Sequence, residues 1–182
     1  MNPLYILIII TIIILIFIIW CIITSNKLNR AVIKIDESLS GIDVALTKRY
    51  DVLTEMTKVV KEYAKHEKET IFETINLRNE MSIKEKNKAN NIMDENFKKI
   101  NIIVEKYPEL KANENYKILQ KAIIDVEEHL QAARRLYNSN VSTYNQLIFT
   151  FPTNTIAKSK GMTKKDFFMA DEIKKENVKI KL

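Results

Sequence analysis

The sequence contains few of the residues on which loop-rich, cross-linked or metal-bound proteins depend. Its 182 residues include two glycines, three prolines, one cysteine and two histidines. So few turn-forming residues argue against a sheet protein, which needs a turn about every ten residues. One cysteine excludes an intrachain disulfide, and with only two histidines it argues against cysteine-rich zinc modules and most metal cages.

Charge is absent from the first part of the chain. Residues 1–26 contain no Asp, Glu, Lys, Arg or His, so all 29 basic and 23 acidic residues follow them. Within residues 4–23 only Thr11 is clearly polar. A helix of this length extends about 30 Å, which is the hydrocarbon thickness of a bilayer. The sequence therefore predicts a transmembrane helix.

The flanks of this apolar segment predict that it is retained and how it is oriented. A cleaved signal peptide or lipoprotein signal needs basic residues before the apolar stretch and small residues at the cleavage site. Neither is present, and Cys21 follows the bulky Trp20. Lys27, Arg30 and Lys34 come soon after the segment. The positive-inside rule then places the N-terminus outside and residues 27–182 in the cytoplasm.

Apolar residues after the anchor repeat at alternating steps of four and three, as in a helix that packs along one face. Arg49 is the one interruption, and Gly41 weakens the helix by about 1 kcal/mol relative to Ala. The repeat consists of Leu28, Val32, Ile35, Leu39, Ile42, Leu46, Leu53, Met56, Val60 and Tyr63.

Three further helices are expected. Ser82 and Glu85 form a capping box, so one helix ends near Met81 and the next begins there and stops at Pro108. Asn113 is a good cap for a third helix, which buries a repeat running from Tyr116 to Ile148 and ends before Pro152. A cap-like signature at residues 163–166 predicts a fourth, short helix that buries Phe167, Ala170 and Ile173.

We therefore predict an all-α protein with an N-terminal transmembrane helix followed by an antiparallel bundle of about four helices. Residues 1–26 form the N-terminal tip and the anchor, and residues 27–182 form the bundle domain. Residues 28–81 as one rod would be about 80 Å long, against about 35 Å for residues 83–106. The rod therefore either bends near residues 49–53 or projects in part.

One acidic stripe resembles a metal site. Glu62, His66, Glu69 and Glu73 lie on one helical face, and metal sites in bundles use inward-facing Glu and His. A carboxylate and histidine metal-dependent enzyme is thus the alternative interpretation. Lysines interleave with this stripe and no second helix offers Glu-x-x-His, which favours a solvated face. We expect no metal, no cofactor and no catalytic residue, and we interpret His129 as a surface or boundary residue.

Two further groups of charged residues are candidates for contacts. The first group lies on largely apolar helices and consists of Asp43, Arg49, Asp51, Arg134 and Arg135. We favour the interpretation that these residues form ion pairs that fix helix register. The alternative is that they line a groove for an anionic or peptide partner. Residues 158–182 contain eight lysines against four acidic residues, without the pattern of base-stacking aromatics that nucleic-acid binding requires. Attraction to anionic lipid, about 1 kcal/mol per lysine, is the expected role of this tail. The lipid-contacting candidates are Lys174, Lys175, Lys179 and Lys181.

Several motifs resemble, in order and spacing, those of the LemA family. They are Ile42-Asp43-Val44 with Leu46 and Arg49-Tyr50-Asp51, residues 61–67, residues 107–113, residues 133–138, Tyr144-Asn145, and Phe151-Pro152-Thr153-Asn154. The chain departs from the family near Leu39, at Thr54, at residues 126–129, where Thr-Glu-Asn-Arg is usual, and at residues 160–162, where Phe-Gly-Phe is usual. The resemblance implies a bacterial membrane protein with a short outer N-terminus, one span and a cytoplasmic helical bundle. It implies no established catalytic activity, cofactor or substrate.

The leading hypothesis is a non-enzymatic, single-pass membrane protein whose bundle binds or scaffolds another protein at the inner face of the membrane. The expected partners are the lipid bilayer and a protein, with self-association as an open alternative and no nucleic acid.

Overall fold

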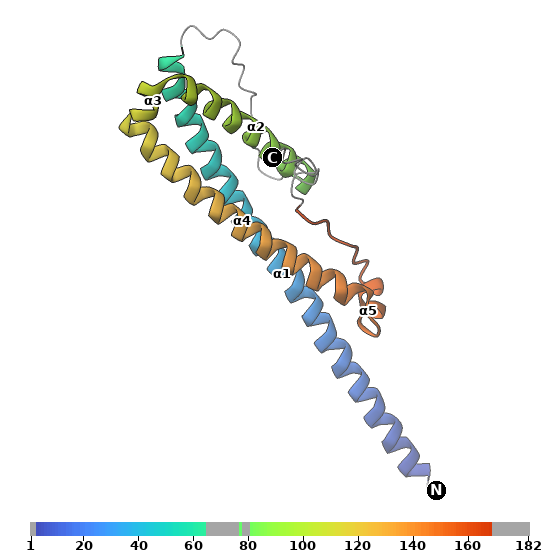
Figure 1. Ribbon diagram of the computed structural model, residues 1–182. Coiled ribbons are helices and arrows are strands. Elements are labelled where there is room, and N and C mark those ends of the chain that lie inside the picture. Colours follow the sequence, from blue (N-terminus) through green and yellow to red (C-terminus); the bar gives the residue numbers. More distant parts are fainter. Residues whose placement is uncertain (1–2, 65–76, 78–80, 169–182) are drawn as a thin grey trace, which may run out of the picture. The chain divides into compact units, whose positions relative to one another are not determined.

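The protein is all-α, as predicted. The structure, a computed structural model, describes residues 3–64, 77 and 81–168. These residues form five helices and no strand (Figure 1). The helices are α1 (Pro3–Tyr63), α2 (Ile83–Lys106), α3 (Pro108–Ala112), α4 (Glu114–Phe149) and α5 (Thr153–Ser159).

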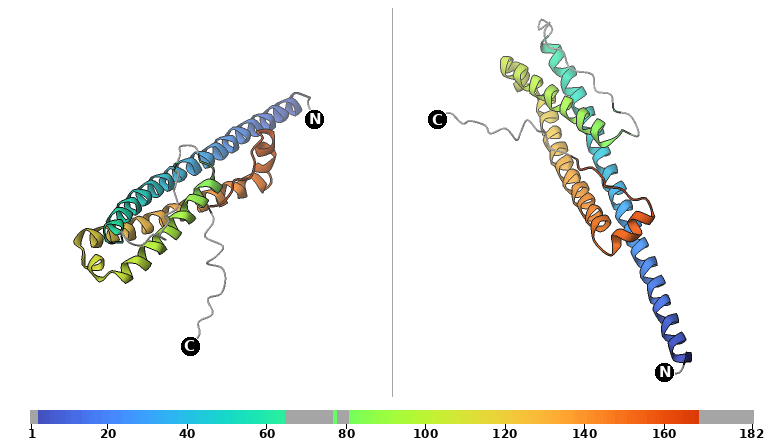
Figure 2. Two further views of the ribbon diagram at one scale, coloured as in Figure 1. Left: turned by 90° about the horizontal axis from the view of Figure 1, so that it is seen from above. Right: turned by 90° about the vertical axis from the view of Figure 1, so that its right-hand side faces the viewer.

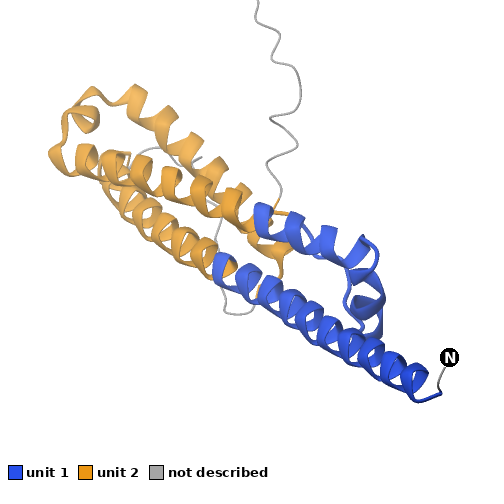
Figure 3. Ribbon diagram, turned by 90° about the horizontal axis from the view of Figure 1, so that it is seen from below, with its two compact units in different colours: residues 1–38, 138–166 blue, residues 39–137, 167–182 orange. Residues whose placement is uncertain are grey.

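The chain divides into two compact units, which are coloured separately in Figure 3. Unit 1 comprises residues 1–38 and 138–166, and unit 2 comprises residues 39–137 and 167–182. Helices α1 and α4 each contribute residues to both units.

In unit 1, the first part of α1 packs against the last part of α4 and against α5. Full burial on α1 begins at Thr24 and continues through Leu28 and Ile35, whereas the described residues before it are exposed except for Trp20 and Cys21, which are half-buried. The side-chain amide of Asn140 on α4 donates to the backbone oxygen of Lys34 on α1 at 2.9 Å. The core opposite α1 consists of Val141, Tyr144, Ile148 and Ala157.

The segment after α5 is extended rather than helical. Helix α5 ends at a Schellman motif around Gly161, whose φ of +65° is left-handed. The N–H of Gly161 donates to the oxygen of Lys158, and the N–H of Met162 donates to the oxygen of Ala157, which are the two hydrogen bonds of that motif. The chain then lies along α4, where the Tyr144 hydroxyl donates to the oxygen of Thr163 at 3.0 Å. The Asn145 amide binds both backbone groups of Lys165 at 3.0 Å.

The predicted fourth helix at residues 163–166 is therefore wrong. Side chains of α4 occupy the backbone groups that a helix starting there would use, and this tertiary pairing overrides the cap-like sequence. Phe167, which was expected to be buried, is 41% exposed, whereas its neighbour Phe168 is buried. Ala170 and Ile173 lie outside the described residues.

In unit 2, α1, α2 and α4 lie side by side, as the views in Figure 2 show. The predicted apolar repeats form most of the core contributed by α1 and α4. The most deeply buried apolar residues of unit 2 as a whole are Ile42, Leu46, Leu53, Met56, Val60, Met93, Ile100, Ile103, Leu110, Tyr116, Ile123, Leu130, Tyr137 and Phe168.

Both predicted caps around α2 and α4 are confirmed. The Ser82 hydroxyl accepts from the N–H of Glu85, while the Glu85 carboxylate accepts from the N–H of Ser82 at 2.8 Å. Asn113 accepts from the N–H of Tyr116 at 3.1 Å, and its amide donates to the hydroxyl of Tyr63 at the end of α1 at 2.9 Å. The one-turn helix α3 was not expected; Pro108, whose fixed φ suits a first helical position, begins it.

The predicted end of the first helix near Met81 is wrong. Helix α1 ends at Tyr63, and Met81 lies outside any helix. Residues 65–70 contain no apolar side chain, so the repeat that α1 buries has no further member there. The helix is also unbroken through residues 49–53, so no interruption divides it at Arg49.

Candidate functional site

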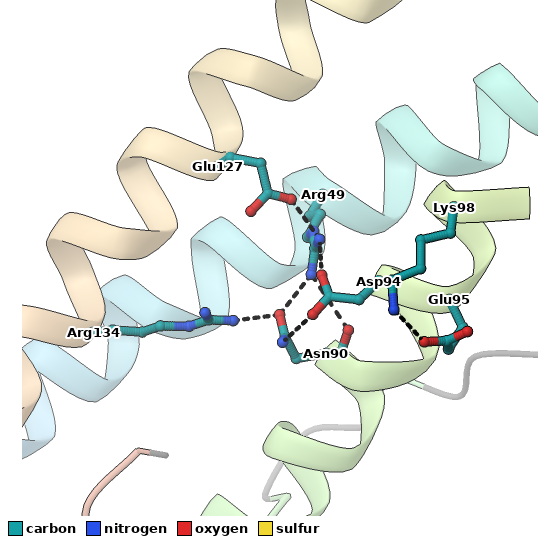
Figure 4. Close-up of polar contacts among 7 residues, drawn as sticks. All are labelled: Arg49, Asn90, Asp94, Glu95, Lys98, Glu127 and Arg134. Atoms are coloured by element: carbon teal, nitrogen blue, oxygen red, sulfur yellow. Dashed lines mark hydrogen bonds and ion pairs between the residues drawn. The ribbon is translucent and has the colours of Figure 1, made fainter. Parts of the chain in front are cut away.

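Arg49 is the most unusual core residue of unit 2. It lies on α1 in the apolar repeat between Leu46 and Leu53 and is only 1% exposed. A buried guanidinium is stable only when charged and polar groups surround it. Figure 4 shows that such groups come from α2 and α4.

The guanidinium of Arg49 contacts three side chains. Its Nη1 donates to the side-chain oxygen of Asn90 at 2.6 Å and to the backbone oxygen of the same residue at 3.4 Å. Its Nη2 pairs with Asp94 on α2 and lies 2.5 Å from Oε1 of Glu127 on α4. One side chain of α1 thus links both neighbouring helices.

A second guanidinium reaches the same asparagine. Arg134 on α4 donates from Nη2 to Oδ1 of Asn90, and its Cζ lies 4.9 Å from the centre of the Phe168 ring. The Asn90 amide is 3.4 Å from Oδ2 of Asp94. We call Arg49, Asn90, Asp94, Glu127 and Arg134 the Arg49 cluster. Figure 4 also shows the pair of Lys98 and Glu95 beside it, which belongs to the surface of α2.

The Arg49 cluster is balanced in charge. It contains two guanidiniums and two carboxylates, and both carboxylates pair with Arg49. A guanidinium does not deprotonate in a protein, so neither Arg49 nor Arg134 is a general base. Arg49 supplies hydrogen bonds from one buried point to α2 and an ion pair from the same point to α4. The chemistry of the cluster suits the fixing of helix register in unit 2.

The other register candidates from the sequence lie apart from the cluster. Asp43 pairs with Lys86, a buried lysine near the start of α2. Asp51 and Arg135 are exposed and take no part in the cluster. His129 is exposed on α4.

Several candidates cannot be placed. Glu62 is exposed near the end of α1, whereas its companions in the acidic stripe, His66, Glu69 and Glu73, lie outside the described residues. Within the described part of the chain no three His, Cys, Asp or Glu side chains lie close enough together to hold a metal ion. The candidate lipid-contacting lysines, Lys174, Lys175, Lys179 and Lys181, also lie outside the described residues.

Sequence reasoning missed most partners of Arg49. Lys86, Asn90 and Asn96 are buried on α2, whereas its large apolar residues Ile92 and Phe97 are half-buried. The missed signal is the apolar repeat of Ile100 and Ile103, which leads to these polar positions when extended backwards in steps of three and four.

A shallow groove lies between α1 and α4 in unit 2. It has a volume of about 370 Å³ and is lined mainly by small and apolar residues, with His129 at its edge. Val44 in this groove is 55% exposed. The apolar lining residues are Gly41, Val44, Ala45, Val126 and Ala133.

The N-terminal part of α1 has a different surface. Within the described residues, α1 is the one helix long and apolar enough to cross a membrane by length and composition, and none of its most apolar stretch is buried. Its exposed side chains include Leu4, Phe17 and Ile23.

Comparison with known proteins gives the relationship of the chain. The LemA family model matches residues 38–182. The chain is 28% identical to Protein LemA of Metamycoplasma hominis over 158 residues, which cover 84% of this chain and 72% of that protein. Over 66 residues it is 29% identical to Magnetosome protein MamQ of Magnetospirillum gryphiswaldense and 30% identical to Magnetosome protein MamQ 2 of Paramagnetospirillum magneticum, covering 36% of this chain and 24% of each relative. The match over most of its length shows that the chain belongs to the LemA family.

Proposed function

We propose that this protein is a single-pass membrane protein whose helical bundle is a non-enzymatic scaffold for another protein at the inner face of a bacterial membrane. The observation that carries the proposal is on α1. None of its most apolar stretch is buried, and the same helix becomes part of a packed core from Thr24 onward. Exposed apolar surface of this extent is stable in lipid and costly in water.

The continuity of α1 supports a scaffold role. No loop separates the apolar stretch from the buried residues of unit 1, so the anchor and the packed part of the chain share one backbone hydrogen-bond ladder. The Arg49 cluster then ties α1 to α2 and α4. Unit 2 is thus held together by contacts from one side chain of α1 to both of its neighbouring helices.

The orientation is proposed from charge. The residues before the apolar stretch contain no Lys or Arg, whereas Lys27, Arg30 and Lys34 follow it. The positive-inside rule then places the N-terminus outside and the bundle in the cytoplasm. Protease added to intact spheroplasts should leave the bundle undigested, and protease added after lysis should digest it. Digestion before lysis would reverse the assignment.

The groove at Val44 is where we expect the partner protein to bind. An exposed branched apolar side chain among small residues can receive an apolar side chain from another protein. A photo-crosslinking amino acid at Val44 in the full chain should give a discrete crosslinked band in living cells. The matched control is the same amino acid at Ile102 on α2, which is equally exposed, at 57%, and does not line the groove.

The two crosslinking positions also separate the open outcomes. A band at Val44 with twice the mass of the chain would make the partner a second copy. Equal labelling at both positions, or none at Val44, would count against the groove as the binding surface. Turnover of a substrate by the purified full chain would overturn the non-enzymatic part of the proposal.

A further inference from the structure

A second groove lies in unit 1 at the level where α1 leaves its apolar stretch. It is open, has a volume of about 590 Å³, and is formed by α1 and the last part of α4. Its lining runs from Ile23 and Leu147 at one end to Lys34 and Asn140 at the other. The hydrogen bond from Asn140 to the backbone of Lys34 closes that second end.

The groove is strongly basic. Lys27, Arg30 and Lys34 line it, at spacings of three and four that place them on one helical face. Among the described residues that line the groove none is acidic, and none of these three cations forms an ion pair with a described residue. Unit 1 contains seven Lys or Arg and three Asp or Glu, so it holds +4 of the net charge of +6.

The cations lie at and just beyond the depth of lipid phosphates if the apolar stretch of α1 spans a bilayer. Along the helix, Lys27 lies about 6 Å beyond Ile23, Arg30 about 10 Å and Lys34 about 16 Å, so the side chains of Arg30 and Lys34 must extend toward the bilayer to reach a phosphate. The headgroup layer extends about 5–8 Å beyond the hydrocarbon on each side. Helical side chains lean toward the N-terminus, so all three cations point back toward the bilayer.

Aromatic side chains lie at the same end of unit 1. Leu147 of α4 and Ile23 of α1 line the same end of the groove. Beyond Leu147, α4 continues in the direction of the apolar stretch and ends at Phe149. Phe149 is 67% exposed and Phe151 in the following turn is 80% exposed. Exposed aromatic rings are costly in water and are favourable at the headgroup level of a membrane.

We propose that this groove binds the headgroup phosphate of an anionic phospholipid, with the acyl chains lying along the apolar stretch of α1. Lys27, Arg30 and Lys34 attract the phosphate, and Ile23 and Leu147 contact the start of the chains. The inference rests on the proposed membrane insertion of α1. It adds a specific lipid as a ligand, which an anchor alone does not require.

The test uses the full chain in nanodiscs of phosphatidylcholine and phosphatidylglycerol, followed by native mass spectrometry of the lipids retained by the released protein. The wild type should retain phosphatidylglycerol in preference to phosphatidylcholine. Lys27→Gln, Arg30→Gln and Lys34→Gln together should reduce this retention at least about ten-fold, because each cation near a membrane surface strengthens binding about five-fold. All three side chains are exposed and Gln is a good helix former, so the fold is retained.

The matched control removes the same charge elsewhere. Lys88, Lys111 and Lys121 are exposed in unit 2, and their replacement by Gln should leave lipid retention at the wild-type level. Equal retention by the two triple variants would overturn the proposal. Displacement of the lipid by millimolar glycerol 3-phosphate or inorganic phosphate would also overturn it, because the groove would then be a site for soluble anions.

Extraction of wild-type membranes with alkaline carbonate distinguishes a failure of this inference from a failure of the proposed function. Release of the wild type would mean that α1 does not anchor the chain, so both proposals would fail. Retention in the membrane, together with unchanged lipid binding by the Lys27, Arg30 and Lys34 variant, would contradict only the lipid site.

Discussion

Arg49 on α1 and Glu127 on α4 form an ion pair in which Nη2 and Oε1 are 2.5 Å apart. Within residues 126–129, Glu127 alone agrees with the Thr-Glu-Asn-Arg motif to which this stretch was compared. Its neighbour Val126 is buried where the family usually has threonine. The polar contact with Arg49 therefore exists in this chain although the residues around it differ.

Loss of the Arg49 side-chain charge should destabilise the bundle. We expect Arg49→Met to lower the free energy of unfolding by about 3 kcal/mol, because Asp94, Glu127 and Asn90 would lose their shared partner inside the protein. The stability of Arg49→Lys should lie between those of the wild type and Arg49→Met, since one ammonium group cannot reproduce the forked contacts of a guanidinium. The measurement is thermal or denaturant unfolding of the full chain in mild detergent.

The control for Arg49 is Arg135→Met on exposed α4 surface, which should change stability by less than about 0.5 kcal/mol. Combining Arg49→Met with Asp94→Asn and Glu127→Gln should recover part of the loss, because the orphaned charges are then removed as well. A cost below about 1 kcal/mol for Arg49→Met would show that the cluster does not hold the helices together.

The sequence predicted where Arg49 lies but not what it binds. Its burial follows from a local pattern, since the residue replaces an apolar side chain between Leu46 and Leu53. Its partners depend on how α2 is rotated and shifted against α1. That register is set by packing across the bundle, and the polar Asn90 and Asp94 offered no apolar periodicity from which to infer it.

The two glycines should respond to substitution in opposite directions. A Cβ at Gly41 would lie 4.0 Å from Cβ of Ala133, which is ordinary contact, so Gly41→Ala should stabilise α1 by about 1 kcal/mol. Gly161 has φ +65°, a left-handed conformation, so Gly161→Ala should cost about 1 kcal/mol or more although nothing lies within 4 Å. Thermal unfolding of the two variants in parallel measures both; the same sign for both would contradict the backbone argument.

Asn145 should hold the segment after α5 through both ends of its amide. Asn145→Asp keeps an acceptor for the N–H of Lys165 but places a carboxylate against the backbone oxygen of that residue. Asn145→Ala loses both bonds. Each change should cost about 1–3 kcal/mol, because the side chain is 8% exposed and its partners would be left unsatisfied.

Hydrogen exchange separates the two Asn145 variants. The amide of Lys165 should stay protected in Asn145→Asp and should exchange rapidly in Asn145→Ala. Gln146→Ala is the matched control, because Gln146 is exposed and its amide donates to the Ser142 hydroxyl at 3.2 Å, not to Lys165. Equal protection of the Lys165 amide in all three variants would show that Asn145 does not hold this segment.

The same segment shows why part of the fold could not be read from sequence. Thr163 and Asp166 have the spacing of a helix start, but the bonds from Tyr144 and Asn145 determine the conformation there. Tyr144 and Asn145 form one of the motifs that resemble the LemA family, but the sequence predicted no structural role for them. Long periodic repeats such as that of α4 were predictable because burial of one face follows directly from their spacing.

Stability should fall in alkaline solution because of two buried tyrosines. Burial raises the pKa of Tyr116 and of Tyr144 above the ordinary value of 10.0. In the unfolded chain both phenols begin to lose their protons near pH 10, while the folded protein still holds them, so the unfolded state binds fewer protons and stability decreases as pH rises. Their contribution is complete below about pH 10 and is lost as pH rises through the folded-state values.

The measurement is the melting temperature of the full chain between pH 8 and about pH 11, combined with the absorbance of tyrosinate. Tyr144→Phe should lower stability at neutral pH by about 1 kcal/mol, since the bond to the oxygen of Thr163 is lost. The same substitution, and more so together with Tyr116→Phe, should reduce the further loss above pH 10. An alkaline loss in the double variant equal to that of the wild type would mean that other groups cause it.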